Sequence, residues 1–293
     1  MFRTEILISM SVLSQSVDED SIFSASISNA KNVYHILKAV HFKDTATVFA
    51  TENGLKVTVE DSKCLQGNAF IQDQIFQEYI LREDSVTFKI NLDILQQLLS
   101  IFGNNSIGST ALKMFHNGYG TPLVLALEED GAVTDCSIKT NEPDEILDFE
   151  FSSSNVINKV IVIAECLKQA FNDLDTTSSD NLEIFMSPDQ PYFRLSTSGD
   201  QGDSHHDIPK DSDMVDFFEC TQTQTNSYRW SLLKPTLKAI SLANKVCIRV
   251  DHRGFLSLQC MIKNESGQVC FVEYYCCPNE DDAVDTQDTY AFK

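Results

Sequence analysis

The apolar positions near the start of the chain repeat at the spacing of a buried helical stripe. After Asn29, a favourable helix-capping residue, they stand at i, i+3, i+4 and i+7 as Val33, Ile36, Leu37 and Val40. Two β-prone runs follow at residues 45–50 and 55–60, joined through Asn53-Gly54, a dipeptide typical of tight hairpin turns. The pattern therefore predicts a helix followed by a β-hairpin.

The rest of the first half alternates between the two periodicities. A strand at residues 85–90 leads into a helix at 91–102, whose apolar side comprises Leu92, Leu95, Leu98, Leu99 and Phe102. Further strands are predicted at residues 111–115, 122–127 and 133–140, separated by the turn signals Asn117-Gly118 and Asp130-Gly131. Residues 141–148 are acidic and contain Pro143, which predicts a linker.

The same order of elements then begins again. We expect a helix at residues 155–174 with Ser154 as its cap, because Val156, Val160, Ile163, Leu167 and Phe171 fall on one side. The remaining predictions are strands at 182–186 and 192–197, an exposed loop at 198–213, a helix at 231–242, and strands at 246–250, 255–262 and 269–276. Each half thus reads as helix, strands, helix, strands, with a repeat counted from Asn29 to Asn155.

This repeat predicts an α+β protein of two similar domains. The predicted parts are a flexible N-terminal extension (1–20), a first domain (21–140), an interdomain linker (141–149), a second domain (150–278) and an acidic, disordered tail (279–293).

Charge and composition limit the functions that such a protein can have. Lys and Arg total 22 against 43 Asp and Glu, and a net charge of −21 would repel DNA unless one face were locally basic. No stretch approaches the ~18 apolar residues of a membrane span, and the first residues lack a signal-peptide cleavage site, so we expect a soluble protein without membrane contact. The nine cysteines include no C-x-x-C pair, which favours free thiols in a reducing compartment over a zinc site.

An enzymatic function is the alternative to a binding function. A metal-dependent nuclease, such as a 3'-5' exonuclease acting on DNA, would need convergent carboxylates. The candidates are Glu128, Glu129, Asp130, Asp148 and Glu150, but they fall in a predicted turn and linker without a spacing that converges them. His205, His206 and Asp207 could bind a metal in the predicted loop, although surface histidines of this kind are more often solvated.

Long segments of the chain resemble one family of DNA-clamp subunits. The segments VTFKINLDILQQLLSIFG, SPDQPYFRLST and GQVCFVEYYCCP look like the Rad-one subunits of the nine-one-one DNA-damage checkpoint clamp, within the PCNA-like class of sliding clamps. The likeness spans roughly residues 27–278. It implies a two-domain clamp fold in which each domain places helices on the inner wall of a ring, backed by antiparallel sheets.

The resemblance also implies a function without catalysis or cofactor. The chain would join two related subunits, Rad-nine-like and Hus-one-like, in a heterotrimeric ring in the nucleus. An ATP-dependent clamp loader would place this ring around double-stranded DNA at damage sites, without sequence specificity, where it serves as a platform for checkpoint and repair proteins.

Two sets of site residues follow from this expectation. On a helical wheel, basic residues lie opposite the apolar stripes, and the DNA-facing set is Lys31, His35, Lys38, Lys159, Lys234, Lys238 and Lys245. The second predicted helix has no basic residue on its polar face. Subunits would join by pairing sheet edges. By position, the edge strands would comprise Ala111, Leu112, Lys113, Met114 and Phe115 in the first domain and Tyr192, Phe193, Arg194, Leu195, Ser196 and Thr197 in the second.

Overall fold

The computed structural model describes residues 21–103, 109–174, 179–200, 202–264 and 267–279. The expected N-terminal extension (1–20) and all but the first residue of the expected tail (279–293) lie outside these described residues. The chain divides into two compact units. The first holds the residues up to Val59 together with Ala69–Glu145, and the second holds Glu60–Asn68 together with the residues from Ile146 onward.

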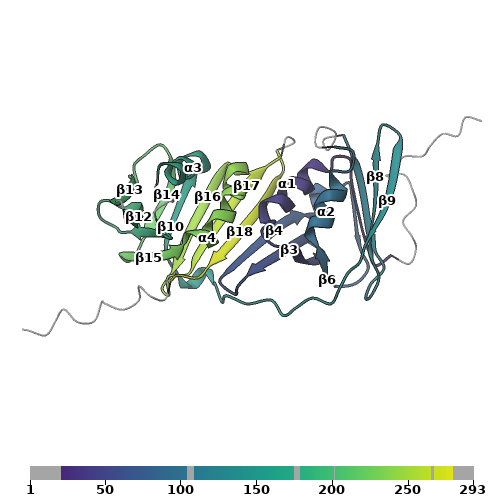
Figure 1. Cartoon of the computed structure of the whole chain (residues 1–293), viewed down its shortest axis with the longest axis horizontal. Coiled ribbons are helices and arrows are strands. Elements are labelled where there is room, and N and C mark those ends of the chain that lie inside the picture. The colour runs from purple at the N-terminus through teal and green to yellow at the C-terminus, as the bar shows by residue number, and fades with distance from the viewer. Residues whose placement is uncertain (1–20, 104–108, 175–178, 201, 265–266, 280–293) are drawn as a thin grey trace, which may run out of the picture. The chain divides into compact units, whose positions relative to one another are not determined.

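Each half of the chain contributes a similar series of elements (Figure 1). In the first half these are β1 (Phe23–Ile27), α1 (Lys31–Val40), β2 (Thr45–Thr51), β3 (Gly54–Asp61), β4 (Leu65–Gln72), β5 (Glu78–Leu81), β6 (Ser85–Asn91), α2 (Leu92–Leu99), β7 (Ala111–His116), β8 (Leu123–Glu129) and β9 (Ala132–Ile138). In the second half they are β10 (Val156–Ile163), α3 (Ala164–Asp173), β11 (Asn181–Met186), β12 (Phe193–Gly199), β13 (Gly202–Ile208), β14 (Val215–Cys220), β15 (Gln224–Arg229), α4 (Trp230–Leu233), α5 (Leu237–Leu242), β16 (Lys245–Asp251), β17 (Leu256–Lys263) and β18 (Val269–Cys276).

Antiparallel sheets form the framework of both units, which confirms the predicted α+β class. In the first unit, β5, β1, β7, β8 and β9 follow one another in one sheet, and β2 pairs with both β3 and β6. In the second unit, one sheet has the order β14-β10-β16-β17-β18 and the other has the order β13-β12-β11-β15. Helices α3 and α5 pack on each other and on the first of these sheets. Within the described residues, no helix has the length and apolar character of a membrane span.

Local signals explain the elements that the sequence predicted correctly. Helix α1 buries the predicted stripe, and the side chain of Asn91 caps α2 by accepting a hydrogen bond from the Ile94 N–H at 2.9 Å. Asp130 and Gly131 have positive φ values of 49° and 81°, as a tight turn between β8 and β9 requires. The first hairpin turn is one residue earlier than predicted, because Thr51 pairs with Gly54 and leaves Glu52 and Asn53 as the turn.

The predicted helix at residues 155–174 is wrong over its first half. Residues Val156–Ile163 form β10, and only Ala164–Asp173 are helical. The segment VINKVIVI is rich in β-branched side chains, which favour strands, and Val160 and Val162 are fully buried while Lys159 and Ile161 are partly exposed. Burial therefore follows a period of two, and each half of the chain begins with a strand, not a helix.

Several strands carry weak sequence signals and were not predicted. Strand β1 has the sequence FSASI and is buried at every position, so it shows no alternation between apolar and polar residues. The predicted loop at 198–213 is wrong, because it contains the polar strand β13, which pairs with β12. Its sequence GDSHHDI lacks an apolar period, so only its pairing with β12 identifies it as a strand.

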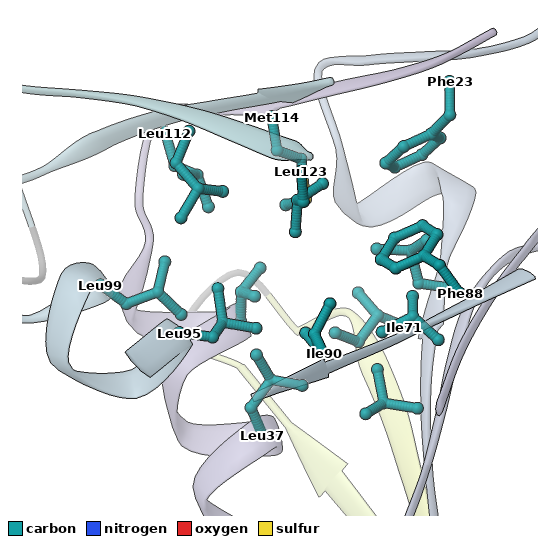
Figure 2. Close-up of a pocket in the computed structure, with 15 residues that line it drawn as sticks. Phe23, Leu37, Ile71, Phe88, Ile90, Leu95, Leu99, Leu112, Met114 and Leu123 are labelled. Atoms are coloured by element: carbon teal, nitrogen blue, oxygen red, sulfur yellow. The ribbon is translucent and has the colours of Figure 1, made fainter. Parts of the chain in front are cut away.

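The core of the first unit is a continuous apolar cluster. Figure 2 shows Leu95 and Leu99 of α2 facing Leu112 of β7 across a small cavity of about 30 Å³. Leu112 is fully buried, so Leu112→Ala removes packed methyl groups and enlarges this cavity. We expect a loss of about 2–5 kcal/mol in the free energy of unfolding, measured by urea titration. Leu242→Ala, at a side chain that is 37 % exposed, is the control and should change the free energy by less than about 0.5 kcal/mol.

The buried side chain of His116 gives stability a dependence on pH. His116 is 2 % exposed, stacks on Phe88 with ring centroids 4.4 Å apart, and has no hydrogen-bond partner for its Nε2 within the described structure. Burial lowers the pKa of His116 below the value of 6.5 that it has in the unfolded chain. The folded state then binds fewer protons than the unfolded chain. The stability that neutral His116 contributes is therefore present above pH 6.5 and is lost as the pH falls towards the pKa of His116 in the folded state. Urea midpoints measured from pH 7.5 to pH 5 should fall less steeply for His116→Phe than for the unchanged chain.

Candidate nucleic-acid and subunit interface

Helix α1 presents the first group of predicted DNA-facing residues. Lys31, His35 and Lys38 lie outside its buried stripe, and Lys38 is exposed in the last turn, 5.7 Å from the centroid of the Tyr34 ring. A cation in the last turn interacts favourably with the negative end of the helix dipole. The helix thus holds cations on the side away from the core.

The last helical segment presents the second group. Lys234 and Lys238 are both exposed, while Thr236, Ala239 and Ile240 are buried on the other side. The predicted helix at 231–242 is not uniform, because a 3-10 turn at Lys234–Thr236 separates α4 from α5. Pro235 lies within this turn and cannot donate the backbone hydrogen bond that an α-helix needs there.

Two of the predicted DNA-facing lysines are not on helices. Lys159 lies in β10 and Lys245 is the first residue of β16, so the prediction that they lie on the polar sides of helices is wrong. Successive side chains of a strand point to opposite faces of the sheet. Since Val160 and Val246 point into the core beneath the helices, Lys159 and Lys245 lie on the opposite face of the sheet.

The same outer face of the sheet holds a charged pair that the sequence did not indicate. The Arg249 guanidinium donates hydrogen bonds to the Glu273 carboxylate and to Ser257 Oγ, the latter at 2.9 Å. The side chains of Arg249 and Glu273 are 18 % and 7 % exposed, and Ser257 also donates to Glu273 at 2.9 Å. Burial, together with the neighbouring Glu273 carboxylate, raises the pKa of Tyr275 well above its usual value.

The second helix differs from the other helices in its polar face. The Oδ1 atom of Asp93 in α2 lies 2.5 Å from the Nε2 atom of His41. This contact links α2 to the end of α1. Exposed Ile94 adds an apolar side chain to the surface of α2. The polar face of α2 therefore carries a carboxylate and no cation, as the sequence indicates.

The strands predicted as sheet edges lie inside their sheets. Residues 111–115 belong to β7, which pairs with β1 on one side and β8 on the other. Residues 193–197 belong to β12, which pairs with β11 and β13, and Tyr192 precedes that strand with a positive φ of 64°. The premise that these strands are edges is wrong, because sequence order does not reveal which strands have partners on both sides.

Other strands provide the edges. In the described sheets, β9 is the last strand beyond β8 and β13 is the last strand beyond β12. Each presents one row of backbone N–H and C=O groups that its own sheet does not pair. Strand β13, GDSHHDI, is polar, whereas β9, AVTDCSI, mixes apolar and polar residues, and all but the last residue of each is at least partly exposed. The two strands share no sequence pattern that identifies them as edges.

The acidic and histidine candidates do not form a catalytic cluster. Glu129 accepts hydrogen bonds from Ser109 at 2.6 Å and Thr110 at 3.1 Å, and Asp148 accepts one from the backbone of Glu150 at 2.8 Å. Asp207 pairs with Arg194, which lowers the pKa of the Asp207 carboxyl, whereas the neighbouring His206 lies 3.8 Å from Asp173. Over the residues that the structure describes, no group of three or more such side chains is placed to hold a metal ion.

A family model and the similar proteins of known name point to the same family. The family model described as repair protein Rad1/Rec1/Rad17 matches residues 22–262. The chain is 58 % identical over 277 residues to the human cell cycle checkpoint protein RAD1, covering 93 % of this chain and 98 % of the human protein. It is 59 % identical over 259 residues to the mouse protein of the same name, covering 88 % and 92 %.

A more distant relative carries a different name. The DNA repair exonuclease REC1 of Mycosarcoma maydis is 25 % identical over 226 residues, which cover 60 % of this chain and 49 % of REC1. The family match and the two mammalian relatives extend across both halves of the chain. This chain therefore belongs to the Rad1 family and has the two-domain, PCNA-like clamp fold.

Proposed function

We propose that the chain is a non-catalytic subunit of a heterotrimeric ring that encircles DNA at damage sites in the nucleus. Family membership carries this proposal, because the mammalian relatives are named as cell cycle checkpoint proteins. In the ring, the chain joins a Rad-nine-like and a Hus-one-like subunit and is placed on DNA by an ATP-dependent loader. The assembled ring then serves as a platform for checkpoint and repair proteins.

The DNA-facing surface of this proposal consists of helical cations. Lys31, His35 and Lys38 on α1, and Lys234 and Lys238 on the last helical segment, face away from the core. A ring that slides needs only weak phosphate contacts without base readout, because its closed topology holds it on DNA. A few cations are therefore sufficient even in a chain with a net charge of −21.

The subunit joints of this proposal are the edges of two sheets. Strands β9 and β13 each leave one side unpaired in the described sheets, so a neighbouring subunit can add a strand to either edge. Such pairing supplies backbone hydrogen bonds in a fixed register. The proposed interface therefore lies one strand further along each sheet than residues 111–115 and 192–197.

Assembly and enzymatic activity can be tested together. The chain is co-expressed with its two candidate partners, and the complex is weighed by light scattering and assayed for nuclease activity with added Mg²⁺ or Mn²⁺. A one-to-one-to-one complex without nuclease activity supports the ring. A stable monomer that degrades DNA from its 3' ends supports the second candidate function, an exonuclease, which the name of REC1 favours.

Charge reversal on the helices should weaken retention on DNA. In the assembled ring, Lys31→Glu, Lys38→Glu, Lys234→Glu and Lys238→Glu together eliminate the proposed cation–phosphate interactions. We expect faster dissociation from closed circular DNA, and a slope of log affinity against log salt that becomes shallower by about 0.9 for each phosphate that is no longer neutralised. The matched control is Lys159→Glu with Lys245→Glu, on the opposite face of the sheet. Equal effects of both sets would contradict the proposed surface.

A further inference from the structure

Two cysteines far apart in the sequence meet where the turn between β3 and β4 reaches the end of β18. This turn closes with the Cys64 N–H donating to the Asp61 carbonyl at 3.0 Å. The Cys277 N–H in turn donates to the Cys64 carbonyl at 2.9 Å. Both cysteines belong to the second unit, since Glu60–Asn68 cluster with it.

This backbone bond brings the two residues within the range of a disulfide. The N–H···O bond of 2.9 Å, with the standard backbone bond lengths on either side of it, keeps the two Cα atoms within about 6.8 Å of each other. Disulfides join cysteines whose Cα atoms are about 4.4–6.8 Å apart. The Cys277 Sγ lies 3.7 Å from the carbonyl oxygen of Lys63, the residue before Cys64, so its thiol lies over the turn that carries its partner.

Accessibility selects Cys277 over its neighbour. Cys64 and Cys277 are both partly exposed, whereas Cys276 is 1 % exposed. Burial raises the pKa of the Cys276 thiol far above its usual value, with smaller effects from Cys277 and Cys64. Since the thiolate is the form that reacts with oxidants, burial protects Cys276, whereas Cys64 and Cys277 are the thiols of this junction that an oxidant in solution can reach.

We propose that Cys64 and Cys277 form an oxidisable dithiol, whose substrate is a hydroperoxide and whose product is a disulfide. The Cys277 thiolate attacks the peroxide, so that an S–O bond forms, the O–O bond breaks and, for hydrogen peroxide, water leaves. The Cys64 thiolate then attacks the resulting sulfenic acid, so that the S–S bond forms, the S–O bond breaks and a second water leaves. The two protons that the thiols give up on ionising are taken up by the leaving hydroxides, which become these two waters. The two sulfurs give up two electrons, and the peroxide accepts them.

The product would fasten a turn from the first half of the sequence to the last strand of the chain. The turn at Ser62 and Lys63 has φ values of 54° and 57°, and Asn279, just beyond Cys277, donates from its backbone to the Ser227 carbonyl at 2.8 Å. A disulfide would add a covalent bond at a junction that backbone hydrogen bonds already hold. Because Cys64 and Cys277 flank most of the chain, the oxidised form would close one large loop.

Peptide mapping of the full chain tests the inference. The reduced protein is treated with a small excess of hydrogen peroxide, quenched by alkylation and digested. We expect both thiols to be lost together, a fragment linking Cys64 to Cys277, and a faster band on a non-reducing gel that dithiothreitol reverses. Either Cys64→Ser or Cys277→Ser should abolish this band, whereas Cys136→Ser and Cys220→Ser, at two other partly exposed cysteines, should retain it.

Three results would overturn the inference, and each can be read from the unsubstituted chain. They are a link from Cys64 to Cys276 instead of Cys277, conversion of either thiol to sulfinic acid without any link, and persistence of both thiols in unoxidised form. Fragmentation of the linked peptide distinguishes Cys276 from Cys277. The test therefore does not depend on whether the variants fold.

Discussion

A proline at one of two neighbouring positions of β13 should strongly weaken assembly of the proposed ring while leaving this chain folded. His205 and His206 pair with Ser196 and Leu195 of β12, and successive N–H groups of a strand point to opposite sides. One of the two N–H groups therefore donates to β12, and the other points away from the sheet. Proline lacks this donor, and leaving the facing carbonyl of the paired strand without it costs about 1–3 kcal/mol, which corresponds to a roughly 5- to 150-fold weaker association.

The two proline variants serve as controls for each other. His205→Pro and His206→Pro should differ, one lowering the thermal midpoint of the isolated chain and the other lowering only its association with the partner subunits. His205→Ala and His206→Ala keep the backbone donors and should assemble normally. Light scattering of the co-purified complex measures the association. A complete ring formed by both proline variants would exclude β13 as an interface strand.

Removal of the Glu273 carboxylate should destabilise the second unit strongly. Glu273→Leu leaves the Arg249 guanidinium in a site where its side chain is 18 % exposed, without the carboxylate that balances its charge. Breaking a buried ion pair in this way costs about 3–5 kcal/mol, because the remaining charge is unpaired and poorly solvated. Urea titration of the single variant measures this loss.

A double variant distinguishes the destabilisation caused by an unpaired buried charge from the stabilisation that the intact ion pair provides. Arg249→Met combined with Glu273→Leu removes both charges and fills similar volume, so the free energy of unfolding should recover most of the loss. Lys168 and Glu165, an exposed pair on α3 with an N–O distance of 3.3 Å, provide the matched control. Lys168→Met should change stability by less than about 1 kcal/mol. A double variant as unstable as Glu273→Leu would show that packing, not charge, explains the effect.

Short-range patterns explain which parts of the fold were predictable. The stripe from Val33 to Val40 and the Asp130-Gly131 turn each depend on residues that are close in sequence, and both were predicted correctly. The segment at residues 156–163 was misread because β-branched residues at apolar positions satisfy either period over a short window. Only its pairing with β14 and β16 decides for a strand.

The predicted DNA-facing residues were likewise placed correctly only where a local sequence pattern was sufficient. Lys31, His35, Lys38, Lys234 and Lys238 lie in helical segments whose polar sides a helical wheel can identify. Lys159 was grouped with them because the third helix was predicted to begin at residue 155 and not at Ala164. Lys245 was grouped with them because the helical wheel was continued past the end of the last helix at Leu242. Their side chains point to the opposite face of a sheet, and this follows from strand alternation.

The α+β class, the two-fold repeat of elements and the resemblance to the Rad1 family follow from the amino-acid order alone, because composition, local periodicity and long matching segments are properties of the chain before it folds. The folded structure was needed to establish that β9 and β13, and not β7 and β12, end their sheets. It was also needed to show that Arg249 meets Glu273 and that Cys64 meets Cys277. Strand pairing joins residues that are far apart in sequence. A short stretch of sequence therefore does not determine which strand pairs with which.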